Sequence, residues 1–131
     1  MPTEVEIAWL AGLIEGEGSI VRALPDKGNP KGRYLFTLEM TDEDVVRRAQ
    51  AIFGAGKVRE SKTRGIGKLP RWVWRLDNRP DVHRLVTLIY PYLGERRKTR
   101  AKEALIWLES VSWTKGRPRN AVKALQTKLA H

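Results

Sequence analysis

Two glutamates lie at the end of the first predicted helix, where the helix dipole is unfavourable for negative charge. Glu15 and Glu17 occupy the last turn of a segment whose apolar spacing predicts a helix over residues 4–17. Carboxylates at that end are expected where a cation compensates them. Oxygen ligands in a chain without cysteine favour Mg²⁺ over Zn²⁺, with Mn²⁺ as a substitute. Metal ions that clamp phosphate oxygens during an in-line displacement are the chemistry of nucleases.

The same helix has a side made of small residues. Ala8, Gly12 and Gly16 recur every four residues, and Ala11 lies beside them. Glycine costs roughly 1 kcal/mol of helix propensity relative to alanine, which suggests a close contact with another backbone. We expect this side to pack on its own copy across a two-fold axis, which would bring two carboxylates to one metal centre. The alternatives are an ordinary helix pair and a solvated helix end.

The predicted dimer interface consists of residues in and beside the small-residue side. Its members are Ala8, Ala11, Gly12, Glu15 and Gly16.

Length and composition limit what can hold these groups in place. The chain has 131 residues, no cysteine and two histidines, which excludes a disulfide scaffold, a zinc ribbon and a thiol nucleophile. No apolar run approaches the roughly 20 residues of a membrane span, and no signal-peptide pattern is present. We expect an intracellular protein without a membrane partner, in the cytoplasm of a bacterium or phage host or in an organelle.

Hydrophobic periodicity predicts helices and hairpins in alternation. The predicted order is a helix over 4–17, strands over 19–24 and 33–40, a helix that opens with a capping box over 41–44, strands over 57–62 and 71–76, a helix that opens at Asn78 and Pro80, and a helix over 96–112. This order predicts an α+β fold in which a curved four-stranded antiparallel sheet has helices on one face. Residues 1–112 would form the domain, and 113–131 a basic tail with a short helix.

Positive charge is concentrated in the second half of the chain. The net charge is +10, yet residues 1–60 carry 8 basic and 10 acidic side chains, whereas 61–131 carry 17 and 5. This distribution indicates a polyanionic partner, foremost nucleic acid, with simple solvation as the alternative. Strand alternation leaves a polar sheet face, suited to base edges in the major groove of double-stranded DNA or to plain solvent exposure. Its candidate residues are Ser19, Arg33, Thr37, Glu39, Lys57, Arg59, Ser61, Arg71 and Arg75.

The segment WLAGLIEGEGSI, from Trp9 to Ile20, resembles the signature of the LAGLIDADG homing endonucleases, with glutamate at both acidic positions. The predicted order also resembles the αββαββα plan of that family over roughly residues 5–112. A single motif in a chain this short implies the homodimeric branch, which acts on near-palindromic double-stranded DNA. The resemblance implies an endonuclease of a mobile genetic element that hydrolyses both strands with Mg²⁺.

The resemblance also implies residue roles. Glu17 matches the catalytic metal-binding carboxylate, and the backbone carbonyl of Gly16 would be a further ligand. Glu15 matches the first acid of the motif, for which a structural role at the helix junction is the alternative. Asp42 falls where the family places a water-organising residue, with a helix-capping role as the alternative, and Glu39 is a neighbouring candidate.

The family places a basic residue that supports the scissile phosphate at the start of its last helix. Alignment from Pro91 favours Arg96, alignment from Ala101 favours Arg97, and Lys98 is the third candidate. Because glutamate adds a methylene to the aspartate of the motif, the alternative function is a catalytically weak or inactive DNA-binding regulator or RNA-splicing accessory.

The tail has one short motif of its own. Residues 115–119 contain the Gly-Arg-Pro core seen in AT-hook segments, which lie in a narrow minor groove. The alternative reading is a basic linker before a last helix. We expect the tryptophans at 72, 74, 107 and 113 to pack in the core rather than to stack on bases.

Overall fold

The computed structural model describes residues 1–62, 67 and 69–110. The elements are α1 (Glu4–Glu17), β1 (Gly18–Ala23), β2 (Arg33–Met40), α2 (Glu43–Phe53), β3 (Lys57–Ser61), β4 (Arg71–Leu76), α3 (Arg79–Ile89), the 3-10 turn η1 (Tyr90–Tyr92) and α4 (Glu95–Ser110). The predicted element order is confirmed over these residues. Trp113, the 115–119 motif and the predicted tail helix lie outside them. None of the helices within the described ranges has the length and apolar character needed to cross a membrane.

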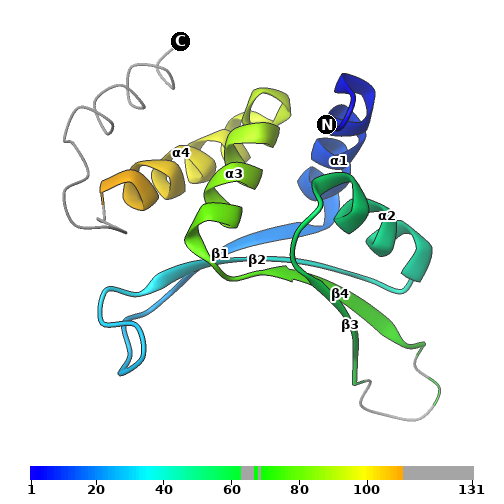
Figure 1. The fold of residues 1–131 in the computed structure, drawn as a ribbon, viewed down its shortest axis with the longest axis horizontal. Coiled ribbons are helices and arrows are strands. Elements are labelled where there is room, and N and C mark those ends of the chain that lie inside the picture. Colours follow the sequence, from blue (N-terminus) through cyan, green and yellow to red (C-terminus); the bar gives the residue numbers. More distant parts are fainter. Residues whose placement is uncertain (63–66, 68, 111–131) are drawn as a thin grey trace.

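The four strands form one antiparallel sheet in the order β1-β2-β4-β3. In the register, Gly18 of β1 lies opposite Leu38 of β2, and Thr37 of β2 lies opposite Arg75 of β4. Figure 1 shows the helices α1, α2, α3 and α4 on one side of the sheet, whose strands curve away from them. The predicted α+β class, with helices covering one face of a curved sheet, is therefore confirmed.

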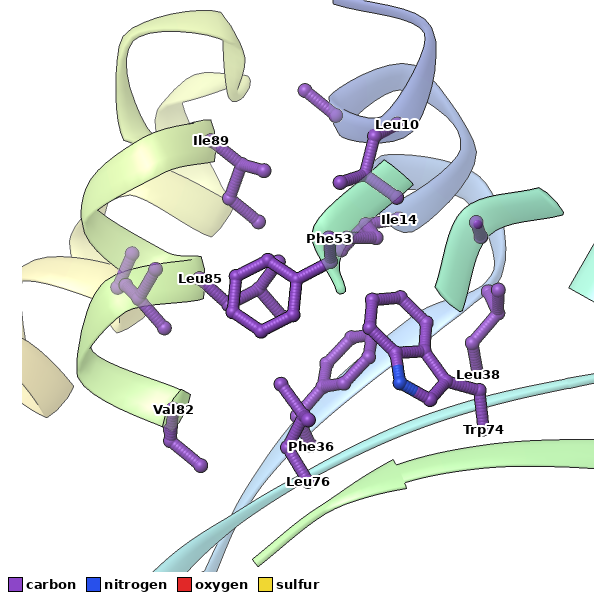
Figure 2. Close-up of a cluster of buried hydrophobic side chains, with 14 of the residues drawn as sticks. Leu10, Ile14, Phe36, Leu38, Phe53, Trp74, Leu76, Val82, Leu85 and Ile89 are labelled. Atoms are coloured by element: carbon purple, nitrogen blue, oxygen red, sulfur yellow. The ribbon is translucent and has the colours of Figure 1, made fainter. Parts of the chain in front are cut away.

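The core lies between the sheet and the helices and is built around two aromatic side chains. Phe36 of β2 and Trp74 of β4 are fully buried and meet edge to face, with ring centroids 4.9 Å apart. Figure 2 shows both rings directed toward the helices, from which Ile14 and Leu85 project. The indole Nε1–H of Trp74 donates to the carbonyl of Ala55 at 2.9 Å. The core thus fixes the sheet face that the helices cover and leaves the opposite face open.

The helix starts differ from the prediction in one place. At α1, Thr3 and Glu6 form a capping box, and the hydrogen bond from the Thr3 N–H holds the pKa of Glu6 below its usual value. The capping box predicted at 41–44 is wrong. The N-cap of α2 is Asp42, so Asp44 is one position too early to reach back, and the Asp42 side chain makes no capping hydrogen bond.

Replacing Trp74 with phenylalanine is expected to lower the free energy of unfolding by about 2–4 kcal/mol. The variant loses buried ring volume and leaves the Ala55 carbonyl without its donor. Urea unfolding followed by circular dichroism measures the change. Leu24→Ala, at a side chain that is 80% exposed, is the control and should change stability by less than about 0.5 kcal/mol. Equal stabilities for the two variants would contradict this account of the core.

Candidate nucleic-acid interface

Helix α1 passes directly into strand β1, and Gly18 makes this junction. Gly18 has an extended backbone (φ −80°, ψ 159°), and its N–H donates to the carbonyl of Ile14. A Cβ at Gly18 would lie 2.7 Å from Ile14 Cγ2 and 2.9 Å from the Ile14 oxygen. The predicted helix stop is confirmed, but it works by close backbone approach rather than by a left-handed residue. Gly18 therefore holds the last turn of α1 in a fixed position relative to the start of β1.

Two of the predicted acidic residues come to the same end of the sheet. Glu17 is exposed and directly precedes Gly18, which pairs with Leu38 near the end of β2. Asp42 follows β2 and is exposed, and its carboxylate is not used to cap α2. Within the described residues, no group of three or more His, Asp or Glu side chains is placed to hold a metal ion. One chain thus presents two exposed carboxylates at this end of the sheet, and the described residues hold no set of three metal ligands.

Glu15 lies against its own chain at Gly94, and its place in a dimer interface stays a prediction. Its side chain is half-buried, and a Cβ at Gly94 would lie 2.9 Å from Glu15 Oε1. The other oxygen, Oε2, is buried without a hydrogen-bond partner. The carbonyl of Gly94 accepts from the N–H of Lys98 at 2.8 Å, so Gly94 stands at the start of α4. A carboxylate beside a helix N-terminus is favourable, which agrees with the structural role considered for Glu15.

The small-residue side of α1 is exposed, with one exception. Ala8, Gly12 and Gly16 are exposed, together with Val5, and nothing lies within 4 Å of a Cβ built at either glycine. Ala11 is the exception: it is fully buried in the core, so its assignment to a dimer interface is wrong. Consecutive helical residues differ by about 100°, which turns Ala11 away from Gly12 and toward the core. The exposed face of α1, defined here as Val5, Ala8, Gly12 and Gly16, is narrower than predicted.

The three basic candidates at the start of α4 differ in their surroundings. Arg97 Nη1 donates to the carbonyl of Gly18 at 2.8 Å, which ties α4 to the start of β1. The Lys98 ammonium lies 5.7 Å from the centre of the Tyr90 ring. Arg96 is exposed and borders a hollow of about 170 Å³ that also touches Ser19. Arg97 borders the same hollow, but its guanidinium is engaged at the junction, whereas Arg96 is the exposed one of the three.

The predicted polar residues of the sheet all lie on the open face. In the register, Ser19, Thr37, Arg75 and Lys57 form one row across the four strands. The complete set also contains Arg33, Glu39, Arg59, Ser61 and Arg71. Five members are basic and one is acidic, and the acid, Glu39, lies 3.4 Å from Arg71. The open face is thus strongly positive, as a surface for a polyanion requires. Its role in binding DNA stays a prediction.

Arg100 and Arg22 are two basic residues of this region that were not among the residues predicted from the sequence. Arg100 borders the same hollow as Arg96, and the four-residue spacing along α4 was the available signal. Arg22 lies on the helix side of β1, near Tyr34 and Trp107. No local pattern marks it, because its neighbours come from distant parts of the chain.

The fold is similar to that of solved homing endonucleases. I-CvuI, in complex with the I-CreI target, matches with a TM-score of 0.61 and 18% identity over 98% of this chain and 96% of that chain. The group I intron-encoded homing endonuclease I-CeuI, complexed with DNA, matches with a TM-score of 0.60 and 16% identity over 98% and 78%. The LAGLIDADG homing endonuclease I-LtrWI, bound to target DNA, matches with a TM-score of 0.65 and 12% identity over 91% and 41%. At such identities the likeness shows a shared fold. No protein-family model and no curated protein matches the sequence.

Two of the three glycines of the motif, Gly16 and Gly18, should respond in opposite directions to the same substitution. Gly18→Ala forces a methyl group onto Ile14 and is expected to destabilise the protein by about 1–3 kcal/mol. Gly16→Ala adds a methyl group in open space within a helix and should stabilise the isolated chain by up to about 1 kcal/mol. Thermal unfolding of both variants measures the difference. A Gly18→Ala variant as stable as the Gly16→Ala variant would contradict the packing described at the junction.

Proposed function

We propose that this protein is a homodimeric, metal-dependent endonuclease that cleaves both strands of a near-palindromic double-stranded DNA site. The observation that carries the proposal is the junction of α1 and β1. There an exposed carboxylate, Glu17, directly precedes a sheet whose open face carries five basic side chains. A basic helix start is tied to the same junction through the bond from Arg97 to Gly18. A carboxylate, a basic helix start and a positively charged sheet face thus lie side by side, which supports the proposal.

The dimer is proposed from the exposed face of α1. Val5 is 79% exposed on that face, and open space surrounds Gly12 and Gly16, so a second backbone has room to approach closely. Packing of two such helices about a two-fold axis brings the two Glu17 side chains near each other. It also sets the two open faces on either side of the axis, which matches the symmetry of a near-palindromic site.

The residues present fit a divalent cation only as a shared centre. One chain offers the exposed Glu17 carboxylate and the Gly16 carbonyl, and no cluster of three acidic or histidine groups exists among the described residues. A second Glu17 and phosphate oxygens of DNA would complete the oxygen ligands that Mg²⁺ or Mn²⁺ prefers. When bound, the ion would supply positive charge to the phosphate and lower the pKa of water.

The side chains of this protein would position the substrate. The open face would hold the duplex through its basic residues, of which Arg75 and Lys57 stand in the same row as Thr37. Arg96 would offset negative charge that develops on the scissile phosphate. Asp42, whose carboxylate does not cap α2, is available to orient a water molecule. The DNA-bound states of the neighbours I-CeuI and I-LtrWI support this choice of partner.

A selection for cleaved sites tests the proposal. The protein is incubated with a randomised near-palindromic duplex library, with Mg²⁺ in one arm and Ca²⁺ in the other. Double-strand cleavage of a defined site only with Mg²⁺ is expected. Tight sequence-specific binding without cleavage in either arm would favour the regulator or splicing accessory instead.

Glu17→Gln is expected to reduce the cleavage rate by at least about 100-fold, because it removes the carboxylate of the metal centre. Binding to the selected site should change little. Gel-based cleavage and fluorescence anisotropy measure the two properties. Glu4→Gln, an identical change in the first turn of the same helix, is the control and should cleave normally. Cleavage by Glu17→Gln at the wild-type rate would refute the role given to this residue.

Gly12→Leu is expected to weaken self-association by at least about tenfold, since the larger side chain separates the two helices. The chain itself should stay folded, because a side chain at Gly12 projects into open space. Analytical ultracentrifugation measures association, and circular dichroism checks the fold. The homodimer is wrong if the wild-type protein sediments as a monomer both alone and on its selected DNA.

A further inference from the structure

Two adjoining hollows lie between the edge strand β1 and helix α4. The first, of about 170 Å³, touches Gly18 and Ser19, and the second, of about 510 Å³, extends along β1 toward Arg22 and Tyr34. Ile20, Arg96 and Arg100 contribute to the walls of both. The hollows therefore form one groove on the helix side of β1, outside the open face of the sheet.

The charge of this groove is one-sided. Its described walls carry the arginines at 22, 96, 97 and 100 and a single acid, Glu103. Arg22, Arg96 and Arg100 are exposed at its surface. Four guanidinium groups line the two hollows with one acid among them, and an anion in the groove would offset their excess positive charge. Arginine presents several donors in a planar fork, which suits phosphate oxygens.

Two of these arginines are held in place by the protein itself. The Arg22 guanidinium lies 4.3 Å from the centre of the Trp107 ring and donates to the carbonyl of Lys31 at 3.1 Å. Arg97 is fixed by its bond to Gly18. Fixed positive groups at two points along the groove lower the entropy lost when an anionic chain binds.

We infer that this groove binds the phosphodiester backbone of a DNA strand that passes around the β1 edge next to Glu17. The inference rests on the proposed function and extends it by a second, sequence-independent contact surface. Because β1 is an edge strand, a DNA strand that leaves the open face there would meet Arg96 and Arg100, which line both hollows. The two hollows, of about 170 and 510 Å³, offer more room than a single phosphate fills, which favours a polymer over a free anion.

The C-terminal tail is the other occupant to consider. Residues 111–131 contain five Lys or Arg side chains and no Asp or Glu. A segment of that charge would add to the excess positive charge of the groove rather than offset it. Charge complementarity therefore selects the DNA backbone.

Charge substitutions on the two sides of the groove test the inference. Arg100→Gln should lower affinity for a random-sequence 30-base-pair duplex by about tenfold at 0.1 M salt, and reduce the slope of log affinity against log salt by about 0.9. Glu103→Gln should raise affinity instead. Arg47→Gln, an equal change of charge on the exposed surface of α2, is the control and should leave the slope unchanged. Equal slopes for Arg100→Gln and Arg47→Gln would overturn the inference.

Crosslinking identifies the occupant directly. The chain has no cysteine, so Arg100→Cys carries a unique attachment point for a photoreactive maleimide. Illumination should join the probe to the duplex, whereas the same probe at Arg47→Cys should not react with DNA. Crosslinks only to residues 111–131, or none to the duplex, would overturn the inference. Loss of the DNA crosslink when inorganic phosphate is added at equal ionic strength would show that the groove binds the free anion. That result would also overturn the inference.

These results are separable from those for the proposed function. Crosslinking and salt dependence need only DNA binding, so they can succeed in a protein that does not cleave. The converse outcome is that the protein cleaves a selected site while Arg100→Gln leaves the salt slope unchanged. That result would support the nuclease function and refute DNA binding in the groove.

Discussion

The close approach of Gly18 to Ile14 is the contact on which the rest of this structure depends. It allows α1 to end and β1 to begin without an intervening loop. The direction of the helix and the register of the sheet are therefore set by one residue, since Gly18 also pairs with Leu38. Arg97 binds the carbonyl of the same glycine and brings α4 to it. Helix α1 and strand β1, which adjoin in the sequence, thus meet α4, whose Arg97 is 79 residues away, at one peptide beside the exposed Glu17.

Helix α1 has two apolar sides with different tasks. Leu10 and Ile14 are fully buried against the other helices and the sheet, which is the ordinary contribution of an amphipathic helix to a core. On the other side, Val5, Ala8 and the two glycines are exposed although they carry no charge. Within the proposed function this second side joins two copies, so that assembly of the protein and assembly of its acidic centre become a single event.

The sequence predicts the elements better than the contacts between them. Strand alternation predicts the faces correctly, since a period of two fixes which side chains lie together, as Thr37 and Arg75 do. In helix α1 the small size of Ala11 and Gly12 did not show that Ala11 faces the core and Gly12 faces solvent, because residue size does not indicate which side of a helix is buried. The sequence also did not show that Arg97, rather than Arg96 or Lys98, makes the contact with the junction. Its partner, Gly18, lies 79 residues away, and no local pattern carries that information.

The strand order has a consequence for how the chain acquires its shape. Strand β2 lies inside the sheet, yet its second neighbour, β4, is supplied only after α2 and β3 have been made. During synthesis the edge of β2 that later pairs with β4 therefore has unpaired amides and carbonyls, next to the apolar ring of Phe36. Such an edge can pair with another nascent chain. Pairing of β4 with β2 removes this exposed edge from the newly made protein.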